Sequence, residues 1–123
     1  MKDKIEQVEK AICEVNQIYD LIWQGEGEMA INQFSRQVTM IGKILQELIS
    51  NIPALDEAGV QLPVDIIMQQ MNNLTDALQY KDEVMLADTL RYEIGETLNV
   101  YLEILKQPEA KDILRFIDSN GEL

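Results

Sequence analysis

Four acidic residues in the C-terminal third of the chain have a spacing that could bind a divalent metal ion. They lie in two short strings, Glu93-Ile94-Gly95-Glu96 and Glu109-Ala110-Lys111-Asp112, with twelve residues between the strings. Residues three apart on a helix share a face, so each string could present two carboxylates. Carboxylate oxygens are ligands that Mg²⁺ accepts. The chain has no histidine, which excludes the di-iron sites built on Glu-x-x-His pairs and histidine acid–base catalysis.

The two strings resemble the E-x-x-E and E-x-x-D motif of all-helical nucleotide pyrophosphohydrolases of the MazG and dUTPase type. The resemblance implies a magnesium-dependent hydrolase, but helix geometry argues against it. About ten further helical residues after Glu96 would carry the chain roughly 15 Å away before Glu109 begins the next helix. We therefore expect that the four carboxylates do not converge, and that the chain is not an enzyme and has no catalytic, cofactor or metal site. The hydrolase is kept as the alternative function.

A second group of residues could recognise a partner. Asp88 is spaced to meet Arg91 three residues later and Tyr92 four residues later on one helix face. The functional interpretation is a recognition patch. The structural interpretation, which we prefer, is a local ion pair and hydrogen bond that contribute a few tenths of a kcal/mol.

Methionines and the single cysteine have structural explanations. Thioethers suit adaptable binding grooves but also fill ordinary cores. We expect Met68 and Met71 in the core, and Met85 is the better candidate for an exposed contact. Cys13 is the one cysteine, so no intrachain disulfide can form, and a partly buried thiol is expected.

The elements that must position these residues are helices. The central ones are predicted over residues 64–79 and 82–106, joined by a short turn, so they should be antiparallel neighbours. Asp82 is the expected N-cap of the second, and Pro108 prevents its continuation. Its apolar residues recur at steps of three and four, as on one face of a helix: Ala87, Leu90, Ile94, Leu98, Tyr101 and Leu105.

Two further apolar stripes precede this hairpin, over residues 5–22 and 31–52. The Gly25 to Glu28 segment separates them, and Pro53 should end the second helix. A helical turn over residues 54–58, closed by Gly59, is predicted next. Gly42 and Gly95 lie in the middle of predicted helices, where glycine is unfavourable. Each could permit the close approach of a neighbouring helix, or each could lie at a surface position that tolerates glycine.

After Pro108, a short helix over residues 109–118 is expected. The helix lengths and connections predict an all-α fold, an up-down four-helix bundle with a short fifth C-terminal helix. We expect one domain over residues 1–123.

Composition narrows the function classes. The chain has 123 residues, 46% of them hydrophobic, and a net charge of −12 from 22 acidic and 10 basic residues. Phosphate backbones and anionic lipid surfaces would repel it, so neither nucleic acid nor membrane is an expected partner. The N-terminus lacks the apolar segment of a signal peptide, and no apolar run approaches a membrane span. A cytoplasmic location is therefore expected.

A weak resemblance covers about 20 residues around 77–94, carried by Ala77-Leu78, Lys81-Asp82, Val84, Leu86-Ala87-Asp88, Leu90 and Tyr92-Glu93-Ile94. This pattern resembles small, uncharacterised all-helical domains of bacterial proteins, a class of unknown function that supplies no catalytic residues. In size, acidity and helical build the chain also resembles the cytosolic chaperones of flagellar and type III export.

The apolar residues exceed what five short helices would cover, and uncovered apolar patches mark interfaces. We therefore predict a non-enzymatic protein–protein interaction module, an adaptor or an export-chaperone-like protein. It is expected to bind a protein partner or to bind itself as a homodimer. The candidate interface residues are Leu21, Trp23, Met85, Leu98, Val100, Leu102, Leu105, Phe116 and Ile117.

Overall fold

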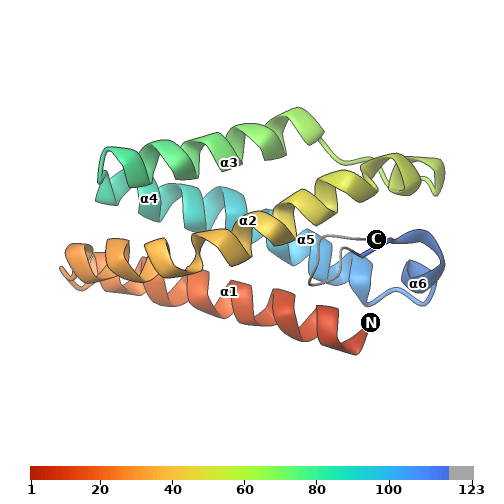
Figure 1. The fold of residues 1–123 in the computed structure, drawn as a ribbon, viewed down its shortest axis with the longest axis horizontal. Helices are drawn as coiled ribbons and strands as arrows, with labels where there is room; N and C mark the ends of the chain where they lie inside the picture. Colours follow the sequence, from red (N-terminus) through yellow and green to blue (C-terminus); the bar gives the residue numbers. More distant parts are fainter. Residues whose placement is uncertain (117–123) are drawn as a thin grey trace.

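The computed structural model describes residues 1–116, and its long helices alternate in direction (Figure 1). The first three are α1 (Lys2–Trp23), α2 (Gly27–Glu57) and α3 (Val64–Gln79). A continuous fourth helix is made of α4 (Glu83–Thr89), the π-helical segment η1 (Leu90–Ile94) and α5 (Gly95–Leu105). The short α6 (Ala110–Ile113) follows at one end of the bundle. This confirms the all-α, up-down four-helix bundle with a short fifth helix.

The predicted apolar stripes form one core between the four long helices. α1 packs against α2 and against the fourth helix, and α3 packs against α2 and α4. Burying the apolar face of each helix is the main favourable contribution to stability in such a bundle. The core includes Val8, Val15, Ile18, Phe34, Ile41, Leu45, Leu48, Leu74, Leu86, Leu90, Ile94, Leu98 and Leu105.

The turn between α3 and α4 is built as the sequence predicts. The side chain of Asp82 accepts a 3.0 Å hydrogen bond from the backbone N–H of Met85, which confirms it as the N-cap of α4. The preceding Lys81 has a φ of 51°, a left-handed conformation that closes the turn. At the other end, the fourth helix stops at Leu105, before Pro108.

The prediction that Pro53 ends the second helix is wrong. α2 runs through Pro53 to Glu57, and the turn expected over residues 54–58 is its last turn. Pro53 is exposed, so its ring faces solvent, and the helix loses the hydrogen bond that a backbone N–H there would have donated. Continuing the helix buries Leu55, which offsets that loss. Gly59, with a φ of 90°, then turns the chain toward α3.

The π-helical segment was not predicted, and it keeps the apolar face of the fourth helix pointed inward. Leu86, Leu90, Ile94 and Leu98 are separated by three successive steps of four residues, and all four are fully buried. On a regular α-helix each such step would rotate the stripe by about 40°. A π turn contains more residues per turn and removes this drift.

The residue that follows the π segment is Gly95, and the backbone there leaves no room for a side chain. Its N–H donates to the carbonyl of Leu90, and a Cβ at this position would lie 2.9 Å from that same oxygen. Gly42, by contrast, has open space around the position of a Cβ. Gly42 therefore occupies a tolerant position, while the close contact at Gly95 is with the carbonyl of Leu90 in its own helix rather than with a neighbouring helix.

The final helix is shorter than expected. α6 covers four residues, and Leu114 leaves it with an extended backbone, at φ −84° and ψ 145°. The part of the predicted helix at residues 117–118 lies outside the described residues. Leu114 is buried, so an extended backbone at this point directs an apolar side chain into the core.

Candidate interaction surface

Eight of the nine predicted interface residues lie in the described part of the chain, where they fall into three groups. Leu98 and Leu105 are buried in the chain's own core, so their assignment to an interface is wrong. Both side chains belong to the core, on the helix that packs against α1, which the sequence pattern alone does not reveal. Trp23 and Val100 are exposed. Half-buried and packed against the core are Leu21, Met85, Leu102 and Phe116, while Ile117 lies outside the described residues.

Two aromatic side chains lie together at the C-terminal end of α1. The ring of Tyr19 is 6.1 Å from that of Trp23, with the planes tilted by 58°. Trp23 is 69% exposed, although an indole ring of this size normally covers apolar area elsewhere. Trp23, one turn after Tyr19, therefore places its large ring in solvent beside the Tyr19 ring.

Arg91, from the π segment, extends this group onto the fourth helix. Its guanidinium lies 5.4 Å from the centre of the Tyr19 ring, a cation–π distance. Its Nη1 also donates a 3.2 Å hydrogen bond to Oδ1 of Asn16 on α1. The expected ion pair between Asp88 and Arg91 does not form. Arg91 turns across to α1 instead, because the planar guanidinium can stack on an aromatic ring and donate at the same time.

Tyr92 completes the group and is 65% exposed. A side-chain hydrogen bond with Tyr19 is the main cause that raises the pKa of the Tyr92 hydroxyl, and the negative charge of Asp88 acts in the same direction. Tyr92 therefore lies beside Tyr19 of α1. We call Asn16, Tyr19, Trp23, Arg91 and Tyr92 the aromatic–arginine patch.

The other exposed apolar side chains are spread over the surface described here. Met68 is exposed, so its predicted core position is wrong, and Cys13 is exposed although a partly buried thiol was expected. Met68 and Ile66 lie on the solvent side of α3, and Val84 lies in the first turn of α4. Single exposed apolar residues are common in monomers. The aromatic–arginine patch differs from them because its members contact one another.

The bundle interior holds a polar cluster that the sequence analysis missed. Glu47 of α2 is 3% exposed, and its Oε1 accepts a 2.7 Å hydrogen bond from the hydroxyl of Tyr101 on α5. Its Oε2 lies 3.0 Å from Nζ of Lys4 on α1. Burial, followed by the contact with Glu47, raises the pKa of Tyr101. A buried carboxylate needs such partners, because an unpaired one would be costly.

A sequence signal for this cluster does exist. Ile44, Glu47, Asn51 and Leu55 follow each other at helical steps, and all four are buried. The pattern is a second inward stripe on α2, interrupted by two polar residues. Two polar residues on such a stripe can be buried with hydrogen-bond partners, or they can lie on a solvated face. The sequence pattern is the same in both cases.

The four acidic residues of the hydrolase-like motif do not form a site. Glu93 faces α3, where its Oε1 accepts a 3.1 Å hydrogen bond from Nδ2 of Asn73. Glu96 lies at the start of α5, which runs for eleven residues from Gly95 to Leu105. Glu109 and Asp112 come after the far end of that helix. Within residues 1–116, no three acidic or cysteine side chains are arranged to hold a metal ion. The predicted separation of the two strings is what the fold produces.

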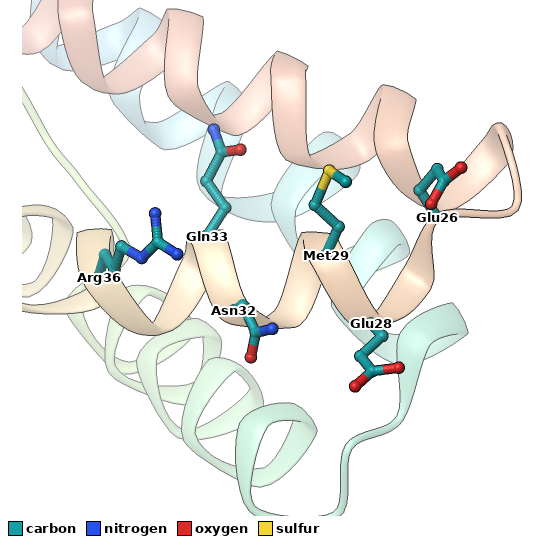
Figure 2. Close-up of a pocket in the computed structure, with 6 residues that line it drawn as sticks. All are labelled: Glu26, Glu28, Met29, Asn32, Gln33 and Arg36. Atoms are coloured by element: carbon teal, nitrogen blue, oxygen red, sulfur yellow. The ribbon is translucent and has the colours of Figure 1, made fainter.

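Neither of two surface hollows in the described part of the chain contains a set of reactive groups. The larger, about 490 Å³, lies on the N-terminal half of α2. Figure 2 shows Met29 and Gln33 pointing from it toward α1, and Glu28 and Asn32 pointing to the other side. The side-chain amide of Gln33 donates a hydrogen bond to the carboxylate of Glu14 on α1. The second, about 340 Å³ and mostly apolar, lies between Val60 and the outer face of α5 around Val100.

No helix within residues 1–116 is both long and apolar enough to cross a membrane. Comparison with known proteins finds no family model, no curated protein and no solved structure that matches the chain.

Proposed function

We propose that this chain is a non-enzymatic interaction module that binds another protein through the aromatic–arginine patch. The observation that supports the proposal is the exposure of Trp23 and Tyr92 around an arginine that is already held in place. Trp, Tyr and Arg are the residue types that most often dominate binding energy at protein interfaces. Arg91 is fixed by Tyr19 and Asn16, so less conformational entropy is lost when a partner orders it.

Charge indicates the chemistry of the partner. With a net charge of −12, the chain attracts basic surfaces over a Debye length and repels acidic ones. We therefore propose a partner segment that combines basic side chains with an apolar or aromatic one that packs on Trp23. An adaptor or an export-chaperone-like role would use such a surface. No observation favours the alternative nucleotide hydrolase, since its four acidic residues lie apart.

The test is native capture of the tagged chain from a lysate of its own cells, followed by mass spectrometry of the retained proteins. The wild type should retain a partner that the Trp23→Ala/Tyr92→Ala variant loses. The matched control is Tyr80→Ala, because Tyr80 is 71% exposed but lies outside the patch. With the partner purified, Trp23→Ala should weaken binding by about tenfold or more. An unchanged set of retained proteins would refute the role of the patch.

Self-association is the other outcome to distinguish. Two copies each carrying −12 repel one another, so a homodimer should strengthen as salt rises, whereas binding of a basic partner should weaken. Sedimentation velocity at low and high salt separates these cases. A dimer that Trp23→Ala dissociates would identify the partner as a second copy of this chain.

A further inference from the structure

The side-chain amide of Asn51 pairs with the main chain of Arg115. Its Nδ2 donates a 2.8 Å hydrogen bond to the carbonyl of Arg115, and its Oδ1 accepts a 2.7 Å bond from the N–H of the same residue. Asn51 is 3% exposed, and a further bond from Nδ2 to the carbonyl of Glu47 fixes the rotamer. The amide thus contacts one residue of an extended segment as a neighbouring strand would.

The residues on either side of Arg115 alternate between inside and outside. Leu114 is buried in the core, the side chain of Arg115 is exposed, and Phe116 is half-buried against the core. Nζ of Lys4 lies 5.5 Å from the centre of the Phe116 ring. The same Lys4 pairs with Glu47, so the segment sits on the polar cluster inside the bundle. Main-chain pairing with pockets for alternate side chains is how proteins bind extended peptides.

We propose that residues 114–116 form a displaceable strap, and that the groove beneath them, formed by Asn51 of α2 and Lys4 of α1, is a binding site for an extended Leu-x-Phe segment. The chain's own strap occupies the site in cis. A partner segment with the same alternation of apolar residues would bind only when the strap leaves. This site is separate from the aromatic–arginine patch and does not depend on the proposed function.

The strap makes few main-chain hydrogen bonds that would prevent its release. The last main-chain hydrogen bond to α6 is from the N–H of Leu114 to the carbonyl of Ala110, at 2.8 Å. Beyond it, the main-chain bonds found within residues 1–116 are the two to Asn51. A three-residue segment held by few main-chain hydrogen bonds opens locally at less cost than the whole fold. The strap should therefore dissociate while the four long helices stay folded.

The first experiment measures binding of a fluorescent peptide with the sequence of residues 110–123 to the full chain by anisotropy. Leu114→Ala/Phe116→Ala in the chain weakens the cis strap, so the peptide should bind at least tenfold more tightly than to the wild type. Arg115→Ala is the matched control, because it removes an exposed side chain and keeps the main chain; it should change the affinity by less than twofold.

Adding Asn51→Leu to the double variant should remove the gain, since the main-chain contacts are lost. Equal peptide affinity for the wild type and the double variant would overturn the proposal, and so would binding that survives Asn51→Leu. A dimer that exchanges straps between copies, seen by sedimentation, would overturn the cis arrangement.

A second measurement on the wild type covers the case in which the double variant does not fold. The amide of Arg115 should exchange its hydrogen at least 100-fold faster, after correction for intrinsic rates, than the amide of Leu45 in the middle of α2. Equal protection would mean that the strap opens only when the bundle unfolds, and would refute displacement.

Discussion

The hydroxyl of Tyr101 donates a 2.7 Å hydrogen bond to the carboxylate of Glu47, and both side chains lie inside the bundle. Lys4 reaches the other oxygen of the same carboxylate. Three residues that are far apart in sequence, each on a different helix, therefore meet at one charged group. Such a cluster adds modest net stability, but removing any one member takes a partner from another in a low-dielectric interior.

We expect Tyr101→Phe to destabilise the fold by about 1–3 kcal/mol, because Glu47 would lose a buried donor while the ring volume is retained. The measurement is urea unfolding followed by circular dichroism. Tyr80→Phe provides the control. That side chain is exposed, so the substitution should change the free energy of unfolding by no more than about 0.5 kcal/mol. Equal stability of Tyr101→Phe and wild type would mean that the hydrogen bond contributes nothing net.

The same residue predicts a dependence on alkaline pH. The pKa of Tyr101 is raised above the ordinary value of 10.0 by burial and by Glu47. Below pH 10 the hydroxyl is protonated in both states, so its contribution to stability does not change with pH. Above pH 10 the unfolded chain releases the proton while the folded chain keeps it, so stability should fall by up to about 1.4 kcal/mol per pH unit.

The check is the difference in unfolding free energy between wild type and Tyr101→Phe at pH 8.5, 9.5 and 10.5. Other tyrosines and lysines titrate in both proteins and cancel in this difference. The advantage of the wild type should shrink only at the highest pH. An advantage that stays constant through pH 10.5 would contradict the raised pKa.

The two mid-helix glycines should respond in opposite directions to alanine. Gly42→Ala is expected to stabilise the protein by about 0.5–1 kcal/mol, because a Cβ there meets open space and alanine is the better helix former. Gly95→Ala should destabilise it, since the Cβ would press on the carbonyl of Leu90. Thermal unfolding of the pair is the measurement, and a stabilising Gly95→Ala would show that the π segment is not required.

Asp82→Ala should cost about 1 kcal/mol, because the backbone N–H of Met85 would lose the acceptor that caps α4. Asp65→Ala is a suitable control: Asp65 is acidic and lies in the first turn of α3, whose N-cap, Pro63, makes no side-chain hydrogen bond. Chemical denaturation of both variants decides the matter. Comparable losses would indicate that charge near a helix N-terminus, rather than the cap bond, is responsible.

Local chemistry was sufficient to predict the helices and some of their ends. The spacing of Leu90, Ile94 and Leu98 indicated a helix whatever surrounds it, and Asp82 could be recognised as a cap because the backbone N–H that donates to it is only three residues away. Pro53 shows where local rules fail. Burial of Leu55 outweighs the missing hydrogen bond, and that burial depends on neighbours supplied by other parts of the chain.

The sequence by itself determined the all-α class, the alternation of the four long helices and the separation of the acidic strings, since these follow from periodicity, turn length and helix rise. Only the tertiary structure decided which apolar residues remain outside. Leu98 and Trp23 are both large and apolar, yet one is in the core and the other in solvent. The partners of Arg91, Glu47 and Asn51 were likewise decided there, because each lies on another element of the bundle, at least 43 residues away in the chain.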